Sequence, residues 1–453
     1  MRDLSYFEKF YYYRHLHSLS SSIFIAAKYD GIQLTPDLIY NCVANIIQKH
    51  PHFYLNIFEK ESKNPFLDKI NRLNLVQIIQ FVDRDIEDVG LIKDLINFKF
   101  EYNNDQLPLW KVLVLKDNWI LFSCDHLLFD GVSCANFHEC LLQEFNRGCT
   151  QYKQMEELAK IPYSVHPEDV INIYKPPKLT LSFMFTVVLP FLLDTISNLL
   201  LTIPLLSFFF FSKKKDILSN SGFLIQKKRF IENYQKLNVP SDKLTRLHGL
   251  CKKRNVTLTS LLLTLFGLAL QRNSVGKDDS ITIGLPINIR CKANTSIDES
   301  KFGLFLKSSD ITITDYLEPC NLGTMDFWKV VSLINAKIRK DVKDDKLFNI
   351  LSLLNFVDID KWLQDKIDRP PTSSFEFSNI GLKFCPSEFT EKCQIVDSLF
   401  CQYLGFQNYF NISCISTVKG GTNFSFNYPY ELTDEVKAFI KTFQQYIDVL
   451  LED

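Results

Sequence analysis

The chain has 453 residues, more than the roughly 250–300 at which one hydrophobic core stops growing, so we expect two lobes. Apolar residues make up 46% of the chain and charged residues 23%, which is typical of a folded globular protein and excludes a disordered one. The formal net charge of −1 gives no reason to expect a nucleic-acid partner.

Twelve cysteines are spread along the chain, from Cys42 to Cys414, without the close CxxC pairs of a structural zinc site. In a chain of this length we interpret them as reduced, buried thiols of a protein that faces the cytosol. The first residues contain no clean apolar core of a secretory signal peptide, which agrees with that location. Because the cysteines form no such close pairs, we predict no bound metal.

The N-terminal half alternates predicted helices and strands. Residue spacing and turn residues predict a short amphipathic helix over 4–14, a strand over 20–29, a helix from Pro36 that ends at Pro51, and strands over 111–115 and 119–124. Three polar residues separate the last two strands, which predicts a hairpin.

His126 stands directly after the second strand of this hairpin, and Asp130 and Gly131 follow it. A histidine titrates near neutral pH, so it can take a proton from an alcohol or amine and return one to a leaving group. At the end of a strand and beside a carboxylate, the ring could be held in one orientation, and Gly131 permits a sharp change of chain direction. The motif is a candidate base site, although a six-residue match to HxxxDG also occurs often by chance.

Residues 179–211 are almost entirely apolar, and Asp194 is their one charge. The stretch exceeds the roughly 20 residues that cross a bilayer, but Pro190 and Pro204 break it into pieces. Lysines flank it on both sides.

The second half begins near residue 222. Its predicted elements are a helix over 257–272 that is apolar on most sides, a buried strand over 281–289, a hairpin over 411–428, and a final helix from Thr433. Pro286 places the buried strand at a bulge or a sheet edge. Helices and strands alternate without βαβ regularity, which predicts an α+β fold of two layers with mixed sheets.

Several stretches together resemble the HxxxD acyltransferases, which share the chloramphenicol-acetyltransferase fold, and the fungal alcohol O-acetyltransferases in particular. The order of strand, His126, Asp130-Gly131 and helix matches the family motif. Further matching stretches occur in the family's order: LSYFEKFYYYRHLHS (4–18), VANIIQKHPHF (43–53), VTLTSLLLTLFGLALQR (256–272), LPINIRCK (285–292), FGLFLKSS (302–309) and FEFSNIGL (375–382). The resemblance covers most of the chain except about residues 150–220.

This resemblance implies two chloramphenicol-acetyltransferase-like lobes with an active-site tunnel between them. It implies that His126 is the general base for the acceptor, which attacks the thioester carbonyl of acetyl-CoA without an acyl-enzyme. Acetyl-CoA would be a co-substrate, and no bound cofactor is implied. Placement of both substrates at one ring nitrogen would supply much of the rate.

The resemblance also implies roles for residues outside the histidine motif. Asp130 resembles a structural aspartate that pairs with an arginine of the second half, here Arg290; the alternative is a solvated surface pair. Ser378 and Asn379 are candidate hydrogen-bond donors to the oxyanion of the tetrahedral intermediate, and turn formation before Gly381 is the alternative. The chain lacks the DFGWG segment of plant members, so its CoA-contacting residues are not predicted.

The positions of His126 and Arg290 restrict the topology of the apolar segment between them. A single span would put the two lobes on opposite faces of the membrane, and no shared tunnel could form. Basic flanks on both sides also fail to define an inside end. We therefore predict a re-entrant or interfacial hairpin over 179–211 with both ends on the cytosolic side; the alternative is an apolar crossover packed on the protein surface. The predicted parts are an N-terminal lobe (1–170), a membrane-associating crossover (171–220) and a C-terminal lobe (221–453).

Together these features predict a CoA-dependent acyltransferase that moves an acetyl group from acetyl-CoA to the hydroxyl of a lipophilic alcohol, such as a fusel alcohol or a sterol. Two alternatives stay open: N-acetyl transfer to a lipophilic amine such as a sphingoid-like compound, and a catalytically inactive membrane lipid-binding protein. We expect a monomer that contacts a membrane surface, on the cytosolic face of the endoplasmic reticulum or on a lipid droplet.

Overall fold

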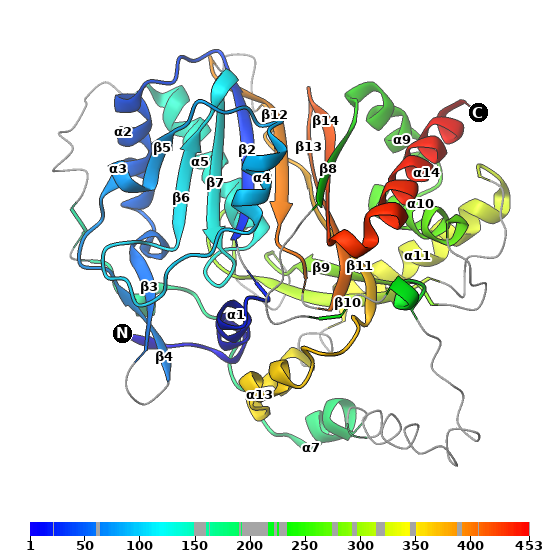
Figure 1. The fold of residues 1–453 in the computed structure, drawn as a ribbon, viewed down its shortest axis with the longest axis horizontal. Helices are drawn as coiled ribbons and strands as arrows, with labels where there is room; N and C mark the ends of the chain where they lie inside the picture. Colours follow the sequence, from blue (N-terminus) through cyan, green and yellow to red (C-terminus); the bar gives the residue numbers. More distant parts are fainter. Residues whose placement is uncertain are drawn as a thin grey trace.

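The structure is a computed structural model. It describes the chain except for residues 21, 60–63, 149–159, 163, 190–191, 193–215, 222–223, 226–232, 274–279, 292–296, 314–321, 345–349, 387–391, 406 and 453. Figure 1 shows two lobes side by side, the N-terminal half in blue and cyan and most of the C-terminal half in green to red. Each lobe is built around its own sheet.

The N-terminal lobe is centred on a five-stranded sheet with the strand order β12-β2-β7-β6-β5. Its strands from this half of the chain are β2 (Ser22–Asp30), β5 (Ile79–Phe81), β6 (Trp110–Val114) and β7 (Trp119–Asp125). The helices are α2 (Pro36–Ile47), α3 (Leu75–Ile78), α4 (Val89–Ile96) and α5 (Gly131–Arg147). The antiparallel pair β6–β7 confirms the predicted hairpin, and α2 confirms the helix predicted from Pro36.

A small sheet and the first helix lie at the edge of this lobe. The sheet has the order β1-β4-β3, with β1 (Arg2–Asp3), β3 (Leu55–Glu59) and β4 (Pro65–Lys69). The predicted N-terminal helix is α1 (Tyr6–Leu16), and a capping box starts it. The Ser5 hydroxyl accepts from the Glu8 N–H, while the Glu8 carboxylate accepts from the Ser5 N–H at 2.7 Å. Figure 1 shows α1 where the two lobes meet, next to α13 (Ile359–Gln364).

The C-terminal lobe is centred on a six-stranded sheet with the order β10-β9-β11-β13-β14-β8. Its strands are β8 (Asn233–Val239), β9 (Thr282–Asn288), β10 (Leu306–Thr312), β11 (Ser373–Leu382), β13 (Asn408–Thr417) and β14 (Gly421–Tyr428). Its long helices are α9 (Ser241–Lys253), α10 (Leu258–Arg272), α11 (Met325–Lys343) and α14 (Thr433–Glu452). Helix α10 packs against the other three, which confirms the predicted buried helix.

Strand β9 lies between β10 and β11, so it is not an edge strand as a whole, but at Pro286 it pairs with β10 alone. It pairs with β10 along its whole length but with β11 only at Ile283 and Gly284. Pro286 follows the point where the pairing with β11 ends, so its missing N–H leaves no ladder hydrogen bond unmade on that side. Because β9, β11 and β13 run parallel and the other pairs antiparallel, the expected mixed sheet is confirmed.

Strand β12 (Gln394–Gln402) comes from the C-terminal half but completes the N-terminal sheet. It pairs antiparallel with β2, and no strand was predicted there. The edge of β12 that faces away from β2 accepts hydrogen bonds from polar side chains of β14. Asn423 and Asn427 donate to the Ser398 and Gln402 carbonyls at 2.7 and 3.2 Å, and Ser425 donates to the Phe400 carbonyl at 2.7 Å. The two lobes are therefore joined through one shared strand.

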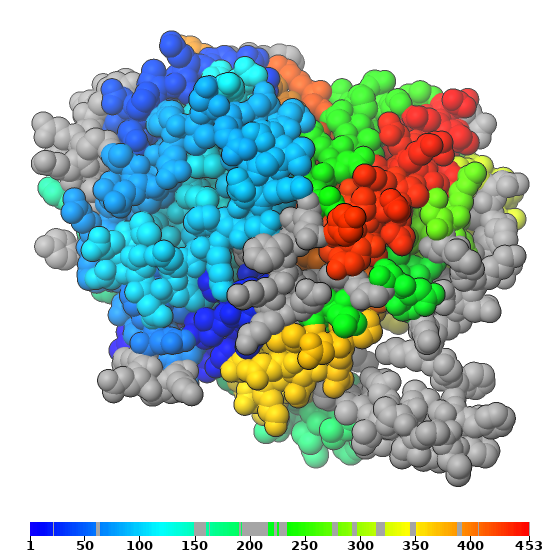
Figure 2. Space-filling model, in the orientation of Figure 1, coloured from blue at the N-terminus to red at the C-terminus, as the bar shows by residue number. Residues whose placement is uncertain are grey.

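The apolar segment 179–211 is described only in its first part, because 190–191 and 193–215 lie outside the described residues. Its start forms α7 (Leu181–Phe183), which continues as a π-helical turn to Val188. Figures 1 and 2 show α7 at the lower edge of the molecule, beyond α13. Among the described residues, none of the helices has the length and apolarity that a membrane crossing requires.

Candidate active site

His126 lies immediately after β7, in the turn that leads into α5, where the two lobes meet. It lines a cavity of about 590 Å³. Strand β7 is inside its sheet, between β2 and β6, which fixes the position where the chain leaves the sheet. The cavity walls include both halves of the chain: α1 and the His126 turn on one side, and β9, β10, β11 and residues 350–357 on the other. This is the position expected for a site between two lobes.

The His126 ring is held against the first helix. Its centroid lies 4.7 Å from that of the Tyr11 ring, and the planes are tilted by 31°. Burial lowers the pKa of His126, and the positive charge of Arg14 lowers it further, against a smaller opposing effect of its own carbonyl and of Asp130. The imidazole is therefore neutral at neutral pH, which is the form that can accept a proton.

Asp130 faces Arg290, and both side chains are buried. The carboxylate oxygens accept from the two terminal guanidinium nitrogens at 2.7 and 2.9 Å. Asp130 also accepts from the backbone N–H of Ser133 at 2.8 Å, capping α5, and from that of Phe305 at 2.9 Å. Although burial alone would raise the pKa of Asp130, these partners hold it below its usual range. The structure thus brings together the predicted pair and fastens the start of α5 to the second half of the chain.

Gly131 lies close to side chains of β11 and β12, which would have to shift to admit a Cβ. It begins α5, and its backbone is not in the left-handed region that favours glycine. A Cβ on this residue would lie 2.6 Å from the Cδ1 atom of Ile380 and 3.1 Å from the Phe400 ring. The sequence analysis expected Gly131 to permit a sharp change of chain direction, but its backbone does not use the conformation that favours glycine. Its small size instead allows side chains of β11 and β12 to approach the helix.

Ser378 and Asn379 both line the cavity from β11. Two hydrogen bonds orient the Asn379 side chain away from the reacting position: it donates one N–H to the Thr259 hydroxyl at 3.3 Å and accepts from the Gly381 N–H at 2.8 Å. The left-handed backbone of Gly381, with φ near 83°, makes this turn possible. Ser378 is therefore the better placed of the two to donate a hydrogen bond into the cavity.

The cavity lining includes residues that the sequence analysis did not name, among them Tyr11 and Arg14 of α1 and Glu376 of β11. Helix α1 was predicted, but its spacing did not indicate that it faces the site. Glu376 carried a signal that could have been used. It stands two residues before Ser378 in a predicted strand, and side chains two apart in a strand share a face.

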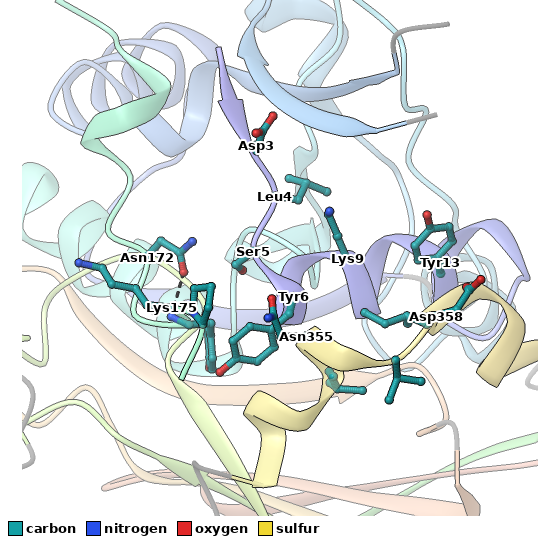
Figure 3. A pocket seen from close by; sticks show the side chains of 15 residues that line it. Asp3, Leu4, Ser5, Tyr6, Lys9, Tyr13, Asn172, Lys175, Asn355 and Asp358 are labelled. Carbon is teal, nitrogen blue, oxygen red and sulfur yellow. Dashed lines mark hydrogen bonds between the residues drawn. The ribbon is translucent and has the colours of Figure 1, made fainter. Parts of the chain in front are cut away.

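A second, smaller cavity of about 410 Å³ lies on the other side of the 354–357 segment. Figure 3 shows Ser5 and Tyr6, at the start of α1, close to Asn172 and Asn355, with Lys9, Tyr13, Lys175 and Asp358 also lining the cavity. Leu354 and Val357 line both cavities and so form the wall between them.

Two buried histidines outside this site, His52 and His138, are neutral structural groups. Burial lowers the pKa of His52 to about 3 and of His138 to about 4. The His138 ring lies 2.9 Å from both the Tyr29 hydroxyl and the Ile25 carbonyl. Within the described part of the chain, no three His, Cys, Asp or Glu side chains are placed to hold a metal ion.

Comparisons with known proteins match nearly the whole chain. The family model described as alcohol acetyltransferase matches residues 3–448. N-acetyltransferase SLI1 of Saccharomyces cerevisiae is 24% identical over 482 residues, which cover 98% of this chain and 99% of the yeast protein. The match therefore includes both lobes and the segment between them.

Solved structures match the fold at low sequence identity. The TRI3 trichothecene 15-O-acetyltransferase from Fusarium sporotrichioides has a TM-score of 0.67 at 13% identity, covering 98% of this chain and 94% of that one. The epimerization domain of tyrocidine synthetase B has a TM-score of 0.62 at 12% identity, covering 99% and 95%. These likenesses show the expected two-lobed fold of condensation domains and acyltransferases.

Proposed function

The chain belongs to the alcohol acetyltransferase family and is an acetyltransferase, and from this premise we propose that it transfers the acetyl group of acetyl-CoA to the hydroxyl of a lipophilic alcohol. The observation that carries the proposal is the position of His126, a neutral imidazole in a cavity between two lobes. Such a group can deprotonate an acceptor that enters from one side while a thioester approaches from the other.

In the proposed reaction His126 acts as a base and then as an acid. Its Nδ1 atom is buried, which leaves Nε2 as the nitrogen available to the acceptor. Nε2 takes the hydroxyl proton as the oxygen attacks the thioester carbonyl, and the carbonyl oxygen becomes an oxyanion. The Ser378 hydroxyl donates a hydrogen bond to that oxyanion. The C–S bond then breaks, and the proton passes from the imidazolium to the thiolate of CoA.

The lining of the cavity supports a lipophilic acceptor such as a fusel alcohol or a sterol. Most of the side chains near α1 and the 350–357 segment are apolar: Phe7, Phe10, Ile350, Leu351, Leu353, Leu354 and Val357. Burial of apolar surface contributes about 25 cal/mol per Å², so a hydrocarbon chain in this wall would bind favourably.

Transfer to a lipophilic amine is the second candidate. The observation that favours it is the match along 99% of a yeast protein named as an N-acetyltransferase. His126 would serve either acceptor, because a neutral imidazole accepts a proton from an attacking amine as from an alcohol.

We further propose that the protein acts as a monomer on a membrane surface, at the cytosolic face of the endoplasmic reticulum or at a lipid droplet. Apolar side chains at the start of the crossover segment support this, because Leu179, Leu181 and Phe185 are 65, 78 and 66% exposed. Lys175 and Lys178 precede them and could meet anionic headgroups.

The test is an acetyl-transfer assay of the purified protein with acetyl-CoA and a panel of lipophilic alcohols and amines. His126→Ala should lower kcat by about 10²–10⁴ with the preferred acceptor, the range that a general base supplies. His248→Ala on α9 is the matched control, because His248 is exposed and lies outside the cavity. Unchanged turnover in His126→Ala would refute the role of His126 as general base. Absence of turnover by the wild-type protein with every acceptor would favour the alternative of a catalytically inactive lipid-binding protein.

A further inference from the structure

Glu376 is a carboxylate in the cavity for which the proposed reaction has no use. It lies on β11 two residues before Ser378, on the same face of the strand, and both side chains line the cavity. Residues in a strand advance about 3.3 Å each, so the two positions are about 7 Å apart along the wall. A group bound at Glu376 would therefore be a few bonds away from the reacting atoms.

The Glu376 carboxylate is held in place by amide side chains. Gln402 donates to one oxygen at 2.7 Å and Asn408 donates to the other at 3.3 Å. The backbone at Gly405 packs close by, since a Cβ there would lie 2.9 Å from the second oxygen. A carboxylate fixed by two neutral donors has further lone pairs for another donor, because each oxygen can accept more than one hydrogen bond.

The position of Glu376 in the sheet explains why it faces a space. Glu376 and Gly284 form the last paired position of β9 with β11. Beyond it, Pro286 and Asn288 of β9 and Ser378 of β11 all line the cavity, so the strands separate there. Glu376 therefore lies at the end of the cavity where the pairing between β9 and β11 stops.

The electrostatic setting favours a ligand that brings a donor. Burial raises the pKa of the Glu376 carboxyl, and the attraction of Arg14 and the two amides only partly oppose this effect. A buried polar group is costly when an occupant of the cavity removes its water without replacing the hydrogen bonds. A purely hydrocarbon occupant would remove water from Glu376 without replacing its hydrogen bonds. An occupant with a second polar group would replace them.

We propose that Glu376 binds a second polar group of the acceptor, a hydroxyl or an ammonium, and so selects long-chain diols or amino alcohols over simple alcohols. This inference rests on the proposed function in that the other polar group reacts at His126. It names a specificity residue, because Glu376 touches the acceptor away from the atom that is acetylated.

The experiment measures acceptor binding by calorimetry without acetyl-CoA. The probes are a twelve-carbon primary alcohol, the primary amine of the same length, and the matching 1,3-diol and 1,3-amino alcohol. Wild-type protein should bind the two compounds with two polar groups about tenfold or more tighter than their single-group partners, as expected for a hydrogen bond to a charged group. Comparison of the diol with the amino alcohol distinguishes a hydroxyl from an ammonium at Glu376.

In Glu376→Gln this preference should fall by about tenfold, while affinity for the simple alcohol stays within about twofold. Asp397→Asn is the matched control. Asp397 is another partly buried carboxylate, held by the Asn423 amide at 2.7 Å, but it does not line the cavity. Its variant should keep the wild-type preference.

Equal binding of all four probes by the wild-type protein would overturn the inference, whether or not Glu376→Gln folds. An equal loss for all probes in Glu376→Gln would also overturn it, because that result indicates a structural role. Neither outcome depends on turnover. A protein that shows the preference but transfers no acetyl group would instead contradict the proposed reaction and leave the binding site in place.

Discussion

Arg14 adds to the effect of burial on His126, the residue on which the proposed chemistry depends. Its guanidinium lowers the pKa of His126, so its removal should raise that pKa. A general base loses activity as the pH falls through its pKa. In Arg14→Leu, the acid limb of kcat/KM should therefore move to higher pH than in the wild type. Rates measured between about pH 5 and 8 would show the shift, and Arg14→Lys, which keeps the charge, should leave the limb near its original position.

Ser378 and Asn379 are neighbours on β11, and their contacts predict unequal contributions to rate. Loss of an oxyanion donor costs about 10²–10³ in kcat, and we expect Ser378→Ala to fall at the lower end of this range. Asn379→Ala should cost less than about tenfold, since its amide already serves Thr259 and Gly381. Steady-state kinetics on both variants check this order. A larger loss in Asn379→Ala would assign the oxyanion to the asparagine.

At the residue scale, the sequence indicated those site residues that lie in recognisable motifs. The motif and the resemblance named His126, Asp130, Arg290 and Ser378, because those positions lie in stretches with a recognisable pattern. Tyr11 and Arg14 lie in such a stretch too, but periodicity alone does not say which structure a helix faces. The ring contact of Tyr11 with His126 and the electrostatic effect of Arg14 on it arise from the docking of α1 between two lobes, which is a tertiary property.

Among the elements, the start of α5 and the region of β9–β10 depend on one ion pair. Asp130→Ala would leave the Arg290 charge buried without its partner, and we expect it to lower the free energy of unfolding by about 3–5 kcal/mol. Urea unfolding followed by tryptophan fluorescence measures this. Replacing both residues, as Asp130→Ala with Arg290→Met, should cost less than the single change. An inactive Asp130→Ala protein of wild-type stability would instead give the aspartate a direct role in catalysis.

Long elements with strong periodicity could be predicted, and α2, α10 and α14 are examples. Strand β12 was missed, and its environment explains why. Its sequence, QIVDSLFCQ, has two polar residues, Asp397 and Ser398, inside an apolar run, and its edge is satisfied by side chains from another sheet. No rule of local sequence indicates that a strand will pair with β2, more than 360 positions earlier in the chain.

For the molecule as a whole, the exposed apolar side chains of α7 and of the π-helical turn that follows it predict attachment to lipid. Leu181→Ser with Phe185→Ser should reduce association with phospholipid vesicles about tenfold or more, because full burial of such a side chain is worth about 1.5–3 kcal/mol. Vesicle flotation measures it. Val418→Ser is the control, since Val418 is 51% exposed on the β13–β14 turn. Flotation of the double variant at the wild-type level would exclude α7 as the contact.

At this scale the two-lobed architecture followed from chain length and the order of weak motifs. The division at about residue 220 did not anticipate that a strand crosses between the lobes. The part of the apolar segment beyond 192 lies outside the described residues, so the predicted membrane hairpin stays a prediction.

Strand β12 also determines how a substrate can reach the buried imidazole. Its antiparallel pairing with β2 lies within the N-terminal lobe, whereas the hydrogen bonds that β12 accepts from side chains of β14 cross to the other lobe, so separating the lobes would break those bonds. Opening the lobes as rigid bodies would also separate the buried Asp130–Arg290 pair, so it is a costly way to admit an acceptor. The same strand makes the protein suitable for fragment complementation. Two polypeptides divided near position 220 should reassemble, because the N-terminal sheet is completed by β12, which only the C-terminal polypeptide contains.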